Sequence, residues 1–200
     1  MSIKLNNLIV ICLGILLLSG CWSSWSTSSS DSQDIYFSDY MMTINKGFLP
    51  IQPEQLTDHR LQGSLIAAYS IPRPTSDYFE KNIVIAQDML WSFTLQRYVS
   101  DAIAGIAKTW WWYKQTGLTA HKVSCGTVEI PALQHDFTIV RGWLNETGQV
   151  IYFVQYFFAK GNKITILSSS TDNEDDIDSL HTYTESIHCA TGTGDVVVSS

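Results

Sequence analysis

Residues 149–159 have the sequence QVIYFVQYFFA, which indicates how the sheet of this protein is built. Side chains of a β-strand alternate between the two faces of its sheet. One face of this stretch would carry Val150, Tyr152, Val154, Tyr156 and Phe158, and the other Ile151, Phe153, Gln155 and Phe157. Because both faces are apolar, we expect a central strand in a sheet that is covered on both sides.

The stretches around this strand predict more of the same sheet. Residues 137–144 and 164–169 read as strands, and the segments 145–148 and 160–163 read as the short turns that join them to residues 149–159. Hairpin turns of this length link antiparallel neighbours, so the three strands are expected to form a meander. Further strands are predicted at residues 35–45, 64–71, 81–88 and 121–130.

Two helices are predicted as the covers of this sheet. The first begins at a cap on Ser92 or Thr94 and runs to about Tyr113, with apolar residues at three- and four-residue spacing. The second begins at Thr171 or Asp172, with acidic residues in its first turn, and runs to about residue 188. The expected fold class is α+β: an α/β/α sandwich whose largely antiparallel central sheet is flanked by a long helix and a C-terminal helix.

Composition limits the classes of function. The 200 residues include 45% apolar and 16% charged residues, so general disorder is not expected. Twelve basic residues stand against nineteen acidic ones, a net charge of −7, and no basic stripe is visible. We therefore expect no nucleic-acid partner, because binding to phosphates requires clustered positive charge.

The first twenty residues read as an export signal. Lys4 precedes an apolar run over residues 8–18, which is too short to span a bilayer. The run ends in Leu-Ser-Gly-Cys at residues 18–21, which resembles the bacterial lipobox. This resemblance implies a diacylglyceryl group on the Cys21 thiol and cleavage just before Cys21. The alternative is a secretory signal in which this cysteine is incidental.

The predicted organisation follows from this anchor. Residues 1–20 are the lipoprotein signal peptide, residues 21–34 a lipidated serine-rich tether, residues 35–189 the folded domain, and residues 190–200 a flexible tail. The expected location is the extracytoplasmic side of a bacterial cell envelope. Trp22, where an aspartate would retain such proteins in the inner membrane, implies the outer membrane if two membranes are present.

Two cysteines remain once Cys12 leaves with the signal and Cys21 carries lipid. Paired thiols are common in exported domains, so a disulfide between Cys125 and Cys189 is expected. Two separate buried thiols are the alternative, and a metal pair is a weaker one.

Residues 35–189 resemble the PsbP-like family, which groups photosystem II extrinsic proteins, a Ran-binding import factor and bacterial lipoproteins. The resemblance is carried by residues 40–49, 79–88, 129–133, 151–163 and 185–187. The chain departs from the family at Pro131-Ala132, where glycine is frequent, and in a longer segment at residues 52–62. The resemblance implies a partner-binding protein without cofactors.

No catalytic or metal-binding motif stands out. The five histidines are dispersed, and the sequence contains no nucleophile elbow, zinc-binding helix or phosphate loop. His181 and His188 would share one face of the last helix, but capping or surface roles explain them better than a metal does. The acidic run at residues 172–178 lacks the spacing of a calcium loop.

Three successive tryptophans occupy residues 110–112, of which Trp110 is assigned to the buried face and Trp111 and Trp112 are the candidate docking residues. If the long helix buries Trp110, a rotation of about 100° per residue places Trp111 and Trp112 on opposite flanks. At least one of the two is then expected to be exposed unless the helix stops at Trp110, and exposed tryptophan is favoured at binding hot spots. Alternatively, residues 52–62 or 115–122 fold over both rings.

The leading functional hypothesis is a membrane-tethered, exported lipoprotein that binds a protein or an envelope component without catalysis. The alternatives are a cell-envelope hydrolase and a lipoprotein that binds a small ligand between sheet and helix. A concave cluster of histidine, aspartate and serine would favour the hydrolase, and an exposed aromatic patch would favour docking.

Overall fold

The computed structural model describes residues 32–51, 65–72, 81–91, 93–110, 112–141 and 148–190. The predicted signal peptide, the lipid-attachment residue Cys21, most of the predicted tether and the tail from residue 191 lie outside the described residues. Among the described residues, no helix is both long enough and apolar enough to cross a membrane.

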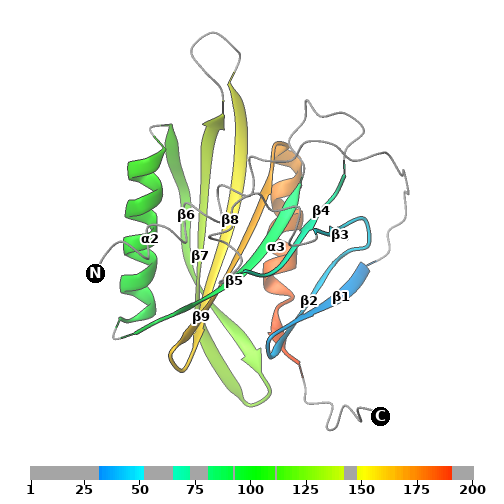
Figure 1. The fold of residues 1–200 in the computed structure, drawn as a ribbon, viewed down its shortest axis with the longest axis vertical. Helices are drawn as coiled ribbons and strands as arrows, with labels where there is room; N and C mark the ends of the chain where they lie inside the picture. The colour runs from blue at the N-terminus through cyan, green and yellow to red at the C-terminus, as the bar shows by residue number, and fades with distance from the viewer. Residues whose placement is uncertain are drawn as a thin grey trace.

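The described strands form one sheet in the order β1-β2-β10-β6-β7-β8-β9-β5-β4-β3 (Figure 1). Their bounds are β1 Ser32–Phe37, β2 Tyr40–Asn45, β3 Leu49–Pro50, β4 Leu65–Ser70, β5 Asn82–Met89, β6 Tyr113–Cys125, β7 Val128–Arg141, β8 Gln149–Lys160, β9 Lys163–Thr171 and β10 His188–Cys189. Strand β8 lies between β7 and β9 and is antiparallel to both, so the predicted central strand and its meander are confirmed.

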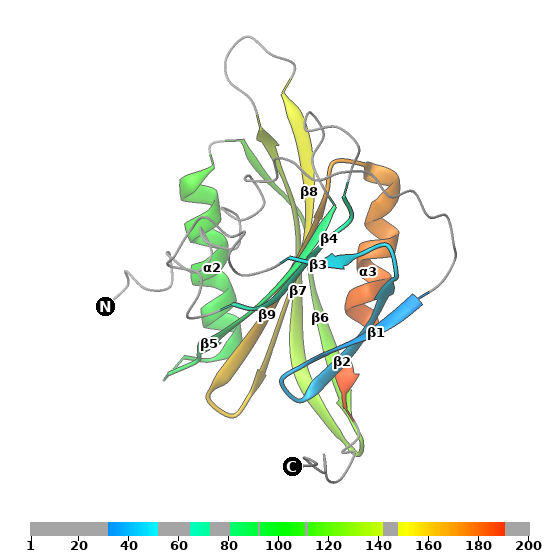
Figure 2. The same ribbon diagram turned by 45° about the vertical axis from the view of Figure 1, so that its right-hand side comes forward.

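Two helices pack on opposite faces of the sheet (Figures 1 and 2). Helix α2, Leu95–Thr109, buries Val99, Ala102 and Ile106 in a cluster with the odd-numbered apolar residues of β8. Helix α3, Ile177–Glu185, follows the short 3-10 helix η2, Glu174–Asp176. Leu180 of α3 is fully buried, and α3 lies against β8, β2 and β9.

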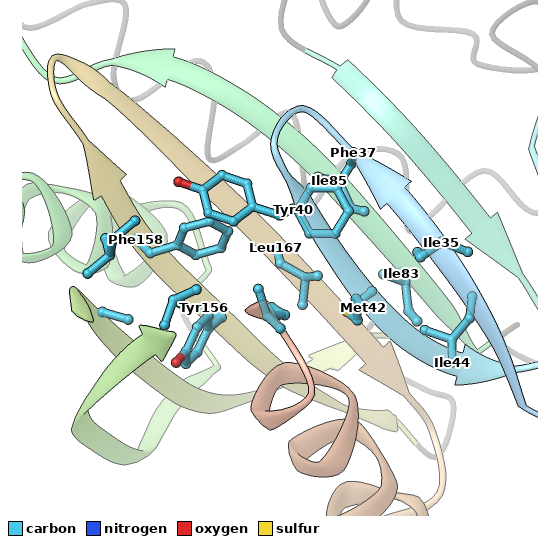
Figure 3. Packing of buried hydrophobic residues seen from close by; sticks show 14 of the residues in the cluster. Ile35, Phe37, Tyr40, Met42, Ile44, Ile83, Ile85, Tyr156, Phe158 and Leu167 are labelled. Carbon is cyan, nitrogen blue, oxygen red and sulfur yellow. The ribbon is translucent and has the colours of Figure 1, made fainter. Parts of the chain in front are cut away.

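The expected α/β/α sandwich is wrong, because the sheet is mixed, strongly curled and forms a half-barrel. The pairing of β10 with β6 is parallel, whereas the other pairs are antiparallel. Side chains of β1 and β2 share a core with Ile83 and Ile85 of β5, which lies near the other end of the strand order (Figure 3). A flat sheet would hold these strands far apart. The helices span only 15 and 9 residues, so the sheet buries much of its apolar surface against itself.

Two predicted strands are hairpins. Residues 35–45 contain β1 and β2, which turn at Ser38, whose φ is 53°. Residues 121–130 contain the end of β6 and the start of β7, which turn at Gly126, whose φ is +68°. A positive φ costs a glycine little, because glycine lacks a Cβ, and this marks a tight hairpin turn within what reads as one strand.

Both helices also end earlier than predicted. The hydroxyl of Thr94 accepts a hydrogen bond from the Arg97 amide and caps α2, as one of the two predicted caps, but the helix ends at Thr109 rather than near Tyr113. The second helix is capped by neither Thr171 nor Asp172. Asn173 accepts a hydrogen bond from the Asp175 amide at the start of η2, and α3 ends at Glu185.

Cys125 and Cys189 form a disulfide, with their Cα atoms 4.6 Å apart. Because the last helix was predicted to run to about residue 188, Cys189 was expected at its end, but it belongs to strand β10. The bond joins the end of β6 to β10, which lies between β6 and β2. It therefore ties the curled half of the sheet, which includes β1 and β2, to the central strands.

Candidate docking surface at strand β6

The tryptophan run lies at the junction between α2 and β6. Trp110 follows the last helical residue in an extended conformation, and its partly buried ring packs against the core beneath α2. Trp112 immediately precedes β6 and is 55% exposed. Trp111 lies outside the described residues. The helical rotation that was expected to separate the three rings does not apply, because the helix has already ended.

Strand β6 is paired along its length on one edge only. Its register with β7 runs from Tyr113 to Cys125, with a bulge between Gln115 and Gly117. On the other edge, the pairing within the described part of the chain is with β10, where His188 lies opposite Ser124. Over residues 113–123, no described strand pairs with that edge. We call this the open edge of β6.

Side chains along the open edge are exposed on both faces of the strand. Leu118 is 46% exposed, and its neighbours Thr119 and Ala120 are exposed on alternate faces. Val123, opposite Ile130, is the buried residue of β6. By contrast, β8 is buried over most of its length. The open edge thus carries an exposed apolar side chain and backbone groups that no strand of the described residues pairs with.

The charges of β6 differ in sign from those of the whole chain. Its basic side chains are Lys114, His121 and Lys122, and it contains no aspartate or glutamate, although the chain has a net charge of −7. Lys122 forms an exposed ion pair with Glu129 of β7. The acidic residues of η2 and the start of α3 lie on other elements, at residues 174–178.

A buried polar row supports β6 from beneath. The hydroxyl of Tyr113 lies 2.9 Å from Nε2 of His135, and Nδ1 of His135 lies 3.5 Å from Oε1 of Gln155. Nε2 of Gln155 donates to the Ser168 hydroxyl at 3.5 Å. In a neutral His135 with its proton on Nδ1, the ring would accept from Tyr113 and donate to Gln155. The row crosses β6, β7, β8 and β9 and fixes their register from inside.

Burial shifts the pKa values of His135 and Tyr113 in this row. Desolvation lowers the pKa of His135 to about 4, against the smaller raising effect of the hydrogen bond to Gln155. Desolvation also raises the pKa of Tyr113 to about 12. Both groups are therefore neutral near pH 7. His135 is 0% exposed, so no substrate can reach its ring in this conformation.

Two other polar pairs bear on the hydrolase alternative. Nε2 of His181 lies 3.3 Å from Oδ2 of Asp136, and Gln134 donates to the same carboxylate. In a hydrolytic triad the carboxylate orients one ring nitrogen and the nucleophilic hydroxyl bonds the other. Within the described residues no hydroxyl hydrogen-bonds to Nδ1 of His181, the nitrogen that does not face Asp136. Asp136 also lies against Gly117, where an added Cβ would be 3.0 Å from Oδ2. The pair connects α3 with the sheet near the bulge.

The second pair joins Lys81 to α3. Its ammonium donates to the Ser179 hydroxyl at 2.7 Å, lies 3.6 Å from a carboxylate oxygen of Asp176, and is 5.6 Å from the ring centre of Tyr183. The Ser179 hydroxyl itself donates to the backbone oxygen of Asp176 at 2.7 Å, so its proton is not directed at the amine as a serine nucleophile would require. This cluster attaches the start of β5 to α3.

The described residues contain no group of three metal-ligating side chains. His181 and His188, the pair considered for a metal, lie on different elements, α3 and β10. Nδ1 of His188 lies 2.8 Å from the backbone oxygen of Ser186.

Sequence reasoning missed the open edge because it placed residues 115–122 in a connecting segment and one strand at residues 121–130. Gly126 was the available signal, since a glycine between two alternating stretches indicates a hairpin turn. It also missed Trp91 and Phe93, which are 65% and 48% exposed and lie just before α2. That pair is at the other end of the helix from Trp112.

Comparison with solved structures places this fold. No family model and no curated protein matches the sequence. Cyanobacterial PsbP from Synechocystis sp. PCC 6803 is similar with a TM-score of 0.54 and 11% identity, over 84% of this chain and 98% of that one. The Ran-binding protein Mog1p from Saccharomyces cerevisiae gives a TM-score of 0.50 and 9% identity, over 80% of this chain and 96% of that one.

A third structure is LpqN, described as involved in cell envelope biogenesis of Mycobacterium tuberculosis. It gives a TM-score of 0.50 and 10% identity, over 79% of this chain and 90% of that one. At such identities the likeness concerns the fold alone. The three similarities agree with the resemblance found in the sequence: this chain has the PsbP-like/Mog1 fold.

Proposed function

We propose that this protein is an exported lipoprotein, anchored to a bacterial envelope membrane through Cys21, whose domain binds another protein without catalysis. The observation that carries the binding role is the open edge of β6, with exposed Trp112 before it and exposed Leu118 within it. Large exposed aromatic side chains at the rim of a rigid element are favoured at binding hot spots.

Three observations support binding over hydrolysis. His135 is buried and neutral, no described hydroxyl bonds the His181 nitrogen that faces away from Asp136, and the Ser179 hydroxyl donates to a backbone oxygen and not to Lys81. Similar folds occur in Mog1p, a Ran-binding protein, and in LpqN, which is involved in cell envelope biogenesis. Protein binding and an envelope setting are therefore compatible with this architecture.

The anchor is tested by metabolic labelling with a fatty-acid probe. The wild-type chain should be labelled, whereas Cys21→Ser should lose the label and accumulate as the unprocessed precursor. Cys12→Ser is the matched control, because Cys12 would leave with the signal peptide and should not alter labelling. Labelling of Cys21→Ser at the wild-type level would refute the anchor.

The binding role is tested by photo-crosslinking in the native host, using the full chain with a photoreactive residue in place of Trp112. The control carries the same group in place of Ile66, an exposed residue of β4 on the far side of the strand order. We expect a discrete protein adduct at Trp112 and none at Ile66. Equal adducts at Trp112 and Ile66 would refute docking at this surface. So would the absence of any adduct both at Trp112 and with the photoreactive residue in place of Leu118.

A further inference from the structure

We propose that the partner binds by strand addition: an extended, acidic segment of another protein pairs its backbone with the open edge of β6. This inference rests on the proposed docking function and specifies the partner's conformation and charge. In strand addition, main-chain hydrogen bonds supply affinity, and alternate side chains of the added strand supply specificity.

The backbone of β6 offers a suitable template. In an antiparallel pair, successive residues direct their N–H and C=O groups alternately toward one neighbour and the other. Because β7 occupies one edge, every second residue of the open edge presents its donor and acceptor outward. The bulge between Gln115 and Gly117 leaves residues 117–123 as the regular part, a length of roughly 23 Å.

The template is rigid before any partner binds. At one end, the disulfide joins Cys125 to β10, and at the other, Tyr113 contacts the buried ring of His135. Between them, β6 is paired with β7 at every residue apart from the bulged Thr116. A preformed edge avoids much of the entropy cost of ordering a binding site, so that cost falls mainly on the partner segment.

The charges of the edge identify the occupant. Lys114 precedes the exposed Leu118, Lys122 follows it in an ion pair with Glu129 of β7, and β6 itself carries no acidic side chain. An extended segment with an apolar residue against Leu118 and an acidic residue against Lys114 would complement this pattern. A second copy of this chain would instead present the same two lysines to the first. Lysines and bulges on exposed edges are features that discourage self-pairing.

A pair of proline variants tests the backbone contribution. Thr119 and Ala120 are adjacent, exposed and outside the bulge, so one of their amides is bonded to β7 and the other points to the open edge. Proline removes the amide proton. Of Thr119→Pro and Ala120→Pro, one should therefore lower the melting temperature markedly, and the other should leave it close to the wild-type value.

The readout is the adduct formed by the lipid-anchored full chain with a photoreactive residue in place of Leu118, with the Ile66 position as control. In the stable proline variant, the adduct yield should fall roughly fivefold, which is the expected effect of losing one intermolecular hydrogen bond. Lys114→Glu, a surface change that needs no assumption about amide direction, should also reduce the yield. Lys163→Glu makes the same charge change at the exposed start of β9, away from β6, and should leave the yield unchanged.

The outcomes separate strand addition from docking in general. An adduct at Trp112 without one at Leu118, or a Leu118 adduct unchanged in the stable proline variant, would leave the docking proposal standing and overturn strand addition. An adduct with twice the mass of the chain would identify a second copy and overturn the acidic partner. If both proline variants unfold, Lys114→Glu decides: an unchanged Leu118 adduct then overturns the proposal.

Discussion

Acidification should destabilise the domain through His135. The group is fully buried, and desolvation lowers its pKa from the ordinary 6.5 to about 4. Below pH 6.5 the unfolded chain binds a proton at this residue, while the folded chain does not until the pH approaches 4. The unfolded state therefore gains stability as pH falls, and the contribution of His135 to the folded state is complete only above about pH 6.5.

The magnitude follows from these two pKa values. With about 1.36 kcal/mol for each tenfold change in proton affinity, the free energy of unfolding should fall by about 2 kcal/mol between pH 7.5 and pH 5 because of His135 alone. The loss should approach about 3 kcal/mol below pH 4.

Urea denaturation of the disulfide-intact domain at a series of pH values measures this effect. His135→Gln keeps a polar side chain beside Tyr113 and Gln155 but cannot titrate. Its unfolding free energy should be lower than that of the wild type at pH 7.5 and should depend less on pH, so that the two curves converge between pH 6.5 and 4. Parallel curves would refute the assignment, because the pH dependence would then come from carboxylates that both proteins share.

Three further changes test the packing. Reducing the Cys125–Cys189 bond, which spans 64 residues, should lower the free energy of unfolding by about 4 kcal/mol in urea titrations, and an unchanged midpoint would contradict this. Phe157→Ala should cost about 3–5 kcal/mol by calorimetry, whereas exposed Leu118→Ala should change stability by less than about 0.5 kcal/mol. Gly117→Ala should cost about 1–3 kcal/mol, because its Cβ would lie 3.0 Å from Asp136; a neutral effect would show that this carboxylate moves freely.

The predicted central strand illustrates what could be derived locally. The apolar residues on both faces of residues 149–159 required cover on both sides, and Phe153 and Phe157 indeed lie in one core while Tyr156 and Phe158 lie in the other. The alternation of side chains in a strand and the apolar spacing in a helix involve neighbouring residues, so both can be recognised in the sequence. The resemblance to the PsbP-like family carried the same information through the order of the elements.

The candidate docking site was predictable only in part. The run of tryptophans predicted an exposed ring after the long helix, and Trp112 is exposed, but the physical reason differs because α2 ends at Thr109. The open edge of β6 could not be predicted, because it exists only since β10 is short and pairs with β6 only near Ser124. Strand β10 has two residues and no periodicity of its own, and its position follows from the path of the chain after α3.

The central meander, the two helices, the cysteines available for a disulfide and the lipobox-like segment are all recognisable in the amino-acid sequence, because each depends on residues within a short window. Three features emerge only in the folded chain: β1 and β2 curl back to share a core with β5, β10 enters between β2 and β6, and β6 keeps an open edge. These features depend on which distant strands bury each other's apolar faces. The pairing of distant strands reduces the exposed apolar surface of the whole chain, so it cannot be predicted from any one segment.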